Sequence, residues 1–552
     1  MSLWPRQRPP GFRLLFALVL SLFLPLVALS LGSAGGQKAA QERLRPEGID
    51  GSLVICGGGK LPDSVLTRFV QLAGGEQAHL VIVPTASDRA DKEAEEKLLA
   101  PWKARKVASV TLLHTRSKQT ANDPKFCSPL QKATGVWFGG GSQGRIADAY
   151  VGTAVEKELY ALLKRGGVIG GSSAGAAVMS RLMIASGNPD AKTAQGFDLL
   201  PAAVVDQHFL KRNRQPRLLA VLEKNPGLVG FGIDEGTALI LRGRQLQVLG
   251  DSTVTVCLAK SATRATRTFE LKPGTPADLT TLRRTAIARA EAPFSPKVAP
   301  VPNVPKGSLV IVGGGGMPAN VTQKFIELAG GPDALIVVLP IAASDGPPKA
   351  TEGNFFKKAG ARNVHTLTAR TLKEIEDPKT IELVKKANAL WFGGGRQWRF
   401  VDAYEGTKAY DLLHDILRRG GVIGGSSAGA TIQGDYLCRG SPLGNLEMMC
   451  EGYERGFAFL PGVAIDQHFA QRKRFRDMTA LIKVYPQLLG IGIDEATALI
   501  VKGHVADVMG RSQVHFYDAR SRAEGAPEYV SVGAGGRYDL KTRQALAPAK
   551  AK

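Results

Sequence analysis

The chain has 552 residues, more than one ordinary hydrophobic core accommodates, so we expect two to four domains. Hydrophobic residues make up 44% of the chain and charged residues 22%, which is the balance of a globular protein. The net charge of +22 is spread over many single Lys and Arg residues, with no basic stripe interleaved with aromatic residues, so we expect no nucleic-acid partner.

The N-terminal segment, residues 1–36, has the pattern of a secretory signal peptide. Arg6, Arg8 and Arg13 precede an apolar run over residues 14–31, and small residues follow it. The same run is long enough to remain as an N-terminal membrane anchor. We therefore expect an exported protein, periplasmic or extracellular, that contacts a membrane only if this segment is retained.

The rest of the chain is an internal duplication. The same motifs follow one another in both halves: SLVI before a glycine triplet, LAGG, WFGGG-x-Q, RGGVIGGSSAGA, DQHF and GIDE. So long a repeat indicates two whole domains rather than a solenoid. We predict domain 1 over residues 48–270 and domain 2 over residues 307–540. They are joined by a Pro- and Ala-rich linker, 271–306, with a short helix near 279–292, and followed by a basic, disordered tail, 541–552.

Each half alternates short apolar runs with amphipathic segments. Runs rich in Val and Ile between helices indicate a buried parallel sheet with helices on both faces. The predicted fold class is therefore α/β, with two tandem, homologous three-layer domains. The last strands of each half, within 237–249 and 497–509, contain glycine turns and are predicted to be antiparallel.

The stretch RGGVIGGSSAGA occurs twice without change, at residues 165–176 and 419–430. Each copy places G-x-S-x-G between an apolar run and small helix-forming residues, which is the sequence context of a nucleophile elbow. Flanking glycines permit strained dihedrals, so Ser173 and Ser427 are expected to stand exposed at the turn. The amides of Ala174 and Ala428 would then face a developing oxyanion. The alternative for one isolated copy is a tightly packed glycine-rich turn without chemistry.

A serine nucleophile needs a base, and the base needs an orienting acid. Of the eight histidines, only His208 and His468 fall in repeated sequence. Each precedes a repeated glutamate, Glu235 or Glu495, by the same 27 residues. The order Ser, His, Glu is therefore available twice.

Other interpretations stay open at these motifs. Asp234 and Asp494 adjoin the glutamates, and strand alternation directs one acid of each pair to the histidine without saying which. DQHF also suits a polar strand end or a metal site, although no third repeated ligand accompanies it. We expect no metal and no organic cofactor. The basic run after DQHF indicates either a solvated helix face or a clamp for substrate carboxylates.

The cysteines suit no dense disulfide framework. Cys438 and Cys450 lie close together in the longer elbow-to-histidine segment of domain 2, where an exported protein can form a disulfide.

Over almost all of residues 52–510, and twice over, this motif set resembles the cyanophycinase family. These are serine peptidases related to aspartyl dipeptidase, with a fold similar to class I glutamine amidotransferases. The resemblance implies cleavage of multi-L-arginyl-poly-L-aspartate, or of similar β-aspartyl-linked material, into dipeptides. It implies Ser173 and Ser427 as nucleophiles, His208 and His468 as bases, and Glu235 and Glu495 as acids. The substrate-binding residues that it implies are Gln143, Asp206, Gln207, Arg212, Arg214 and Arg217 in domain 1, and Gln397, Asp466, Gln467, Arg472 and Arg474 in domain 2.

The sequence departs from the family pattern in three ways. Asp477 stands where the third arginine of domain 2 is expected, and an acid there would repel an aspartyl polymer unless Arg476 compensates. The elbow-to-histidine segment is shorter in domain 1, which would reshape one wall of its pocket. The tandem arrangement would mimic a homodimer, with the domains facing each other across a pseudo-two-fold axis.

We therefore predict an exported serine-type exopeptidase with two active sites, acting on a peptide or polymer rich in aspartate and arginine. One alternative is an exported peptidase for small aspartyl or isoaspartyl dipeptides, because the elbow and triad do not report polymer length. Another is a protein that has lost activity and binds acidic polymers through its basic pockets. Serine rather than cysteine at both elbows disfavours amidotransferase-like chemistry.

Overall fold

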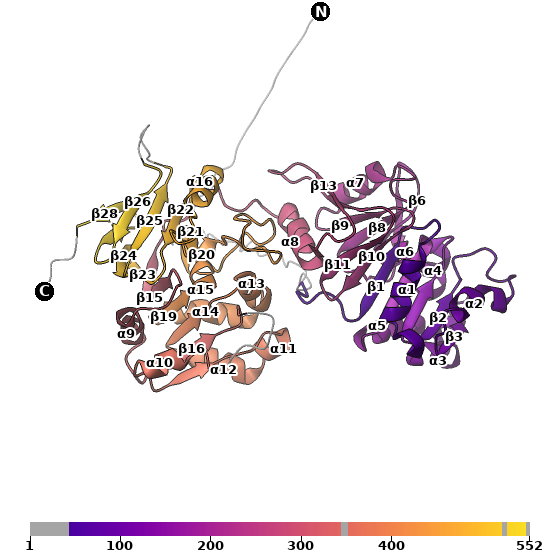
Figure 1. Cartoon of the computed structure of the whole chain (residues 1–552), viewed down its shortest axis with the longest axis horizontal. Coiled ribbons are helices and arrows are strands. Elements are labelled where there is room, and N and C mark those ends of the chain that lie inside the picture. Colours follow the sequence, from indigo (N-terminus) through magenta and orange to yellow (C-terminus); the bar gives the residue numbers. More distant parts are fainter. Residues whose placement is uncertain (1–43, 344–350, 521–526, 548–552) are drawn as a thin grey trace, which may run out of the picture. The chain divides into compact units, whose positions relative to one another are not determined.

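The computed structural model describes residues 44–343, 351–520 and 527–547. The predicted signal segment, residues 1–36, lies outside these ranges. Within them, no helix is both long enough and apolar enough to cross a membrane. The first repeat runs from indigo to magenta in Figure 1 and the second from orange to yellow.

An eight-stranded sheet forms the centre of the first repeat. Five strands run parallel, and three more extend the sheet in antiparallel fashion through the predicted glycine turns. Across the sheet the order is β14 (Ala277–Asp278), β11 (Gln245–Gly250), β10 (Thr237–Arg242), β1 (Ser52–Cys56), β5 (Val168–Ser172), β4 (Gly135–Phe138), β2 (His79–Val83) and β3 (Ser109–Leu112).

Helices cover both faces of this sheet, and alternate side chains of β1 pack on opposite faces. Leu53 and Ile55 pack into the core beneath one set of helices, whereas Val54 and Cys56 pack with Phe69 on the opposite face. The helices of the repeat are α1 (Asp63–Leu72), α2 (Glu95–Lys103), α3 (Pro124–Lys132), α4 (Gln143–Tyr150), α5 (Ala154–Lys164), α6 (Ala174–Ala177) and α7 (Gln215–Lys224), with short 3₁₀ turns at Gly75–Gln77 and Thr120–Asn122.

The second repeat has the same strand order with one further strand, β28, at the edge, which agrees with the predicted duplication. Its sheet runs β17 (Val364–Thr366), β16 (Ile336–Leu339), β18 (Ala389–Phe392), β19 (Val422–Ser426), β15 (Val304–Val312), β23 (Thr497–Gly503), β24 (Val505–Gly510), β27 (Arg537–Asp539) and β28 (Gln544–Leu546). The helices are α9 (Ala319–Leu328), α10 (Asn354–Lys358), α11 (Leu372–Ile375), α12 (Pro378–Lys386), α13 (Trp398–Tyr404), α14 (Lys408–Arg418), α15 (Ala428–Thr431) and α16 (Phe475–Val484).

Each repeat also contains a smaller second sheet, which the single predicted sheet did not include. The chain turns after the GIDE motif, so the long apolar run there divides into two strands that belong to different sheets. The first repeat has β13 (Arg267–Leu271), β12 (Val254–Leu258), β9 (Val229–Ile233) and β8 (Ala203–Gln207), plus a hairpin of β6 (Leu182–Ser186) and β7 (Lys192–Gln195). The second repeat has β20 (Gly434–Tyr436), β21 (Leu460–Gln467), β22 (Leu489–Ile493), β25 (Gln513–Asp518) and β26 (Val530–Gly533).

Two predicted loose segments are packed. In the predicted linker, α8 (Leu279–Ala290) buries Leu279, Leu282 and Ala286 in the core of the first repeat. In the predicted disordered tail, residues 541–547 are ordered, because β28 pairs with β27 and the Arg543 guanidinium bonds to Asp518 and to the carbonyl of Leu488. The remainder of the tail, residues 548–552, lies outside the described residues.

Candidate active sites

Both serines occupy strained strand-to-helix turns. β5 ends at Ser172 and α6 begins at Ala174, and Ser173 between them has φ 53° and ψ −106°. Ser427, between β19 and α15, has φ 57° and ψ −114°. Non-glycine residues rarely adopt this conformation, and at strand-to-helix turns it marks a nucleophile elbow. A side chain at Gly171 would lie 2.5 Å from the backbone of Gly175, which explains the glycine spacing.

Each serine lies within hydrogen-bond distance of the predicted histidine, which in turn contacts the predicted glutamate. Ser173 Oγ lies 2.9 Å from His208 Nε2, and His208 Nδ1 lies 2.6 Å from Glu235 Oε1. The second repeat reproduces both distances.

There, Ser427 Oγ is 2.9 Å from His468 Nε2, and His468 Nδ1 is 2.6 Å from Glu495 Oε1. The two triads have the geometry that lets a histidine take a proton from a serine while a carboxylate fixes its tautomer.

The acids beside the glutamates have a structural role, which resolves the choice that strand alternation left open. Asp234 accepts hydrogen bonds from the Lys211 amide and from Ser252 Oγ. Asp494 accepts from the Ala470 amide and from Ser512 Oγ. Each aspartate therefore ties the end of one strand to the loop after the histidine, while the neighbouring glutamate turns to the imidazole.

The glycine triplets after β1 and β15 make room for the triads, a role that the sequence did not reveal. A Cβ atom on Gly58, whose φ is +100°, would lie 2.4 Å from His208 Cε1. On Gly314, whose φ is +97°, it would lie 2.3 Å from the same atom of His468. The next glycines, Gly59 and Gly315, make similarly close approaches to the triad glutamates. Only glycine allows the backbone to lie against the imidazole here.

Both histidines are held in the neutral form that a base requires. Burial lowers the pKa of His208 and of His468 below the ordinary value of 6.5. The hydrogen bond that the imidazole donates to the triad glutamate opposes this shift, and the charge of Arg212 or Arg472 adds to it. Near neutral pH each imidazole is thus free to accept a proton.

A cavity of about 520 Å³ opens beside the first triad. It contains Ser173, His208 and most of the predicted substrate-binding residues of this repeat. The other lining residues are Gly141, Gln143, Ala185, Ser186, Gly187, Asn188, Gln207, Arg212, Arg214 and Arg217. Among the described residues, Gln207 Oε1 is a buried acceptor without a hydrogen-bond partner, so it can accept from a ligand or from water.

Two of the predicted substrate contacts, Asp206 and Arg217, also form a buried ion pair at the cavity. Asp206 is fully buried, and Arg217 is 3% exposed. Arg217 Nε lies 2.7 Å from Asp206 Oδ2, its Nη2 bonds to Asp206 Oδ1, and its Nη1 donates to the carbonyl of Gly187. Gln143 likewise donates its side-chain amide to the carbonyls of Ile184 and Ala185, and so fixes the cavity wall.

The second repeat holds its corresponding residues in the same way. Gln397 donates to the carbonyls of Cys438 and Arg439, and Gln467 Oε1 is again buried without a partner among the described residues. Asp466 is fully buried and accepts from Arg474 Nη1 at 2.7 Å, whereas Arg472 is exposed.

A residue that sequence reasoning missed completes this site. Arg439 contacts Asp466 and Asp477, so the Asp477 carboxylate lies against a guanidinium from another part of the chain. Arg476 is exposed. The predicted bond between Cys438 and Cys450 is also absent, because both are buried free thiols.

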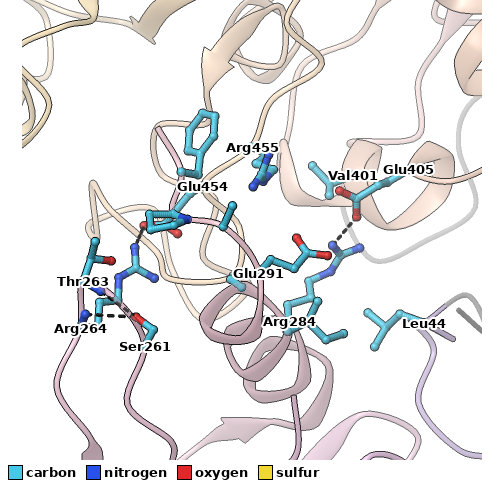
Figure 2. Close-up of a pocket in the computed structure, with 16 residues that line it drawn as sticks. Leu44, Ser261, Thr263, Arg264, Arg284, Glu291, Val401, Glu405, Glu454 and Arg455 are labelled. Carbon is cyan, nitrogen blue, oxygen red and sulfur yellow. Dashed lines mark hydrogen bonds and ion pairs between the residues drawn. The ribbon is translucent and has the colours of Figure 1, made fainter. Parts of the chain in front are cut away.

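A separate cavity of about 190 Å³ lies away from both triads (Figure 2). Charged side chains from both repeats line it, and two of the pairs are Arg284 with Glu405 and Arg264 with Glu454. It contains neither nucleophilic serine, so we assign it to the contact between the repeats.

Two nucleophile elbows at the ends of buried strands, each facing a histidine, define the class of α/β hydrolytic enzymes. The model of peptidase family S51 matches residues 53–249 and 309–509, one region in each repeat. The chain belongs to peptidase family S51, as a cyanophycinase-like peptidase with a tandem duplication.

Two cyanophycinases agree with this assignment. The cyanophycinase of Geminocystis herdmanii (strain PCC 6308) is 33% identical over 201 residues, which are 35% of this chain and 74% of that protein. The cyanophycinase of Trichormus variabilis (strain ATCC 29413 / PCC 7937) is 31% identical over 233 residues, 40% of this chain and 78% of that protein. A solved peptidase from an acI-B1 Actinobacterium is 23% identical, with a TM-score of 0.33, covering 42% of this chain and 98% of that one.

Proposed function

We propose that this peptidase uses serine nucleophiles to release dipeptides from β-aspartyl-arginine polymer (cyanophycin) or from similar aspartyl-linked peptides. One observation carries the proposal: a single cavity holds Ser173 and His208 together with Arg212 and Arg214. Guanidinium groups beside a nucleophile suit a substrate whose scissile bond is surrounded by fixed carboxylates.

The triad geometry supports the following sequence of steps. Ser173 Oγ attacks the scissile carbonyl as His208 Nε2 takes its proton, and the tetrahedral oxyanion faces the amide of Ala174. His208 then returns the proton to the leaving amine, and water releases the acyl group by the reverse exchange. Ser427, His468, Glu495 and Ala428 have the same roles in the second repeat.

The arginines divide into two groups in this proposal. Arg212 is exposed and Arg214 is partly buried at the cavity, so they bind substrate carboxylates. The free Oε1 of Gln207 accepts from a substrate nitrogen. Asp206 and Arg217 hold these groups in place through their buried ion pair.

The first test is product analysis on insoluble cyanophycin with the parent protein, Ser173→Ala, Ser427→Ala and the double variant. We expect dipeptide from both single variants and none from the double variant. Release by only one single variant would identify the inactive repeat. If the parent protein releases nothing, cyanophycin is not its substrate.

The same variants then decide between the alternatives. Cleavage of soluble aspartyl or isoaspartyl dipeptides by the parent alone would indicate a small-peptide peptidase. Binding of acidic polymer that is unchanged by the double serine substitution, without any cleavage, would indicate a binding protein.

We also propose that the chain is exported, since residues 1–36 have the pattern of a signal peptide. N-terminal sequencing of the protein recovered from outside the cytoplasm tests this. A mature protein that begins near residue 37 supports cleavage, whereas Met1 on a membrane-bound protein indicates a retained anchor.

A further inference from the structure

The two repeats hold the aspartate before the catalytic histidine with arginines from different elements. In the first repeat the arginine is Arg217, on α7, nine residues after His208. The residue nine positions after His468, on α16, is Asp477. Helix α16 therefore supplies an acid at the position where α7 supplies the buried guanidinium.

In the second repeat Arg439 supplies that guanidinium. It is 3% exposed, and its Nε lies 3.1 Å from Asp466 Oδ2. Its Nη2 lies 3.1 Å from the same oxygen and 2.5 Å from Asp477 Oδ2, and its Nη1 donates to the carbonyl of Asn445. Arg217 likewise binds its aspartate through Nε and Nη2 while Nη1 holds a loop carbonyl.

The position of Arg439 in the fold is that of Ala185, not that of Arg217. The conserved geometry of the two glutamines shows this, because Gln143 donates to the carbonyl of Ala185 and Gln397 donates to the carbonyl of Arg439. Two exchanges thus distinguish the repeats. Ala185 corresponds to Arg439, and Arg217 on α7 corresponds to Asp477 on α16. Together they keep a guanidinium against a fully buried carboxylate.

We propose that Arg439, braced by Asp477, is a positioning residue of the second active site and replaces the helix arginine of the first. This inference rests on the proposed function. Arg439 acts through Asp466, whose Oδ1 also accepts from Arg474 and from the amide of Gln467. The contacts of Arg439 with Asp466 and Asp477, here called the brace, therefore position two groups that bind substrate. They also neutralise Asp477, which would otherwise present an unpaired carboxylate to an acidic substrate.

The test uses the Ser173→Ala background, in which only the second site works, and soluble aspartyl-arginine peptides as substrate. Arg439→Ala should raise KM about tenfold or more with a smaller change in kcat, because uniform binding is lost. Adding Asp477→Arg should recover most of the lost affinity, since Arg439→Ala/Asp477→Arg recreates the arrangement of the first repeat. Arg476→Ala is the matched control, because Arg476 is exposed and directly precedes Asp477 in the sequence. This substitution should leave KM unchanged.

The reciprocal exchange is made in the Ser427→Ala background. Arg217→Asp should raise KM, and Ala185→Arg/Arg217→Asp should restore it. Thermal unfolding of every variant separates loss of the brace from loss of the fold. An unchanged KM in folded Arg439→Ala, or a folded double exchange no better than Arg439→Ala, would overturn the proposal.

Failure of the proposed function gives a different result. If neither single-site background cleaves, the hydrolytic assignment is wrong, and calorimetric binding of an aspartyl-arginine dipeptide takes the place of KM. A loss of affinity with Arg439→Ala and its recovery on adding Asp477→Arg would then support the positioning role of Arg439. Equal affinities across the set would exclude it.

Discussion

Burial, to which the positive charge of a nearby arginine adds, sets the pH at which the sites lose activity. Because the pKa of His208 is lowered, the base stays neutral until the pH falls below the ordinary histidine range near 6.5. In the Ser427→Ala background, kcat/KM should therefore fall on the acid side with an apparent pKa below 6.5.

Arg212 contributes to that lowering, so Arg212→Gln should move the acid limb to higher pH. Lys211→Gln, an exposed neighbour, should leave the limb in place. The readout is the position of the limb and not the overall rate, which Arg212→Gln also lowers through binding. A limb that stays in place, or moves to lower pH, would show that Arg212 does not act on the histidine.

Gly58→Ala should inactivate the first site. The added methyl group would lie 2.4 Å from His208 Cε1 and displace the imidazole from Ser173, so activity in the Ser427→Ala background should fall about 10²–10⁴-fold. Gly75→Ala is the matched control, because Gly75 also has a positive φ (+64°) but nothing within 4 Å of the added atom. Comparable losses in both variants would show that backbone strain, and not the contact with the imidazole, is responsible.

At the scale of elements, the last strand pair is a stabilising part of the second repeat. Arg543, whose side chain is 1% exposed, lies 2.8 Å from Asp518 and also bonds to the carbonyl of Leu488. Arg543→Ala would leave the Asp518 carboxylate without this partner, and we expect a loss of about 3 kcal/mol in the free energy of unfolding.

Urea denaturation measures this loss, with the exposed Lys541→Ala as control. A difference between the two variants of less than about 0.5 kcal/mol would show that β28 is only loosely attached.

The sequence predicted those elements whose motifs occur in both repeats. The elbow serines, the histidines and the glutamates were all found in this way, and the structure brings each set of three together. The parallel strands were predicted because their apolar runs are short and bounded by glycine. The second sheet was not, because the turn after GIDE divides what reads as one continuous apolar run.

The role of Arg439 could not be predicted from the sequence, for a physical reason. It lies in the longer segment of the second repeat, and its contact with Asp466 spans 27 residues and depends on how that segment folds. Neither motif nor periodicity marks such a residue. The sequence contains one indirect signal, Asp477 in place of an arginine, because a carboxylate at such a position needs a cation nearby.

At the scale of the whole molecule, ionic contacts join the repeats through non-equivalent surfaces. Arg244, on the turn between β10 and β11, lies 2.6 Å from Asp402 on α13, and Arg289 on α8 lies 2.7 Å from Glu451. The residue that corresponds to Arg244 in the second repeat is His504, which bonds to the carbonyl of Pro302. These contacts therefore differ between the two repeats.

Glu451→Gln should loosen α8, because it weakens the pairing of the buried Arg289 and of Arg264. We expect faster amide hydrogen exchange across Leu279–Ala290. Glu447→Gln, exposed in the same loop, should leave the exchange unchanged. If exchange in α8 is the same in both variants, the ion pairs do not contribute to its protection.

The relocated guanidinium also constrains how one repeat can evolve into the other. Any route of single substitutions passes through a protein with either both arginines around the buried aspartate or neither. The first intermediate crowds both arginines, in addition to Arg474, around one carboxylate, and the second leaves that carboxylate one partner short with a second acid beside it. Asp477→Arg and Arg439→Ala recreate these two intermediates, so their relative activities would show which of the two paths selection could have followed.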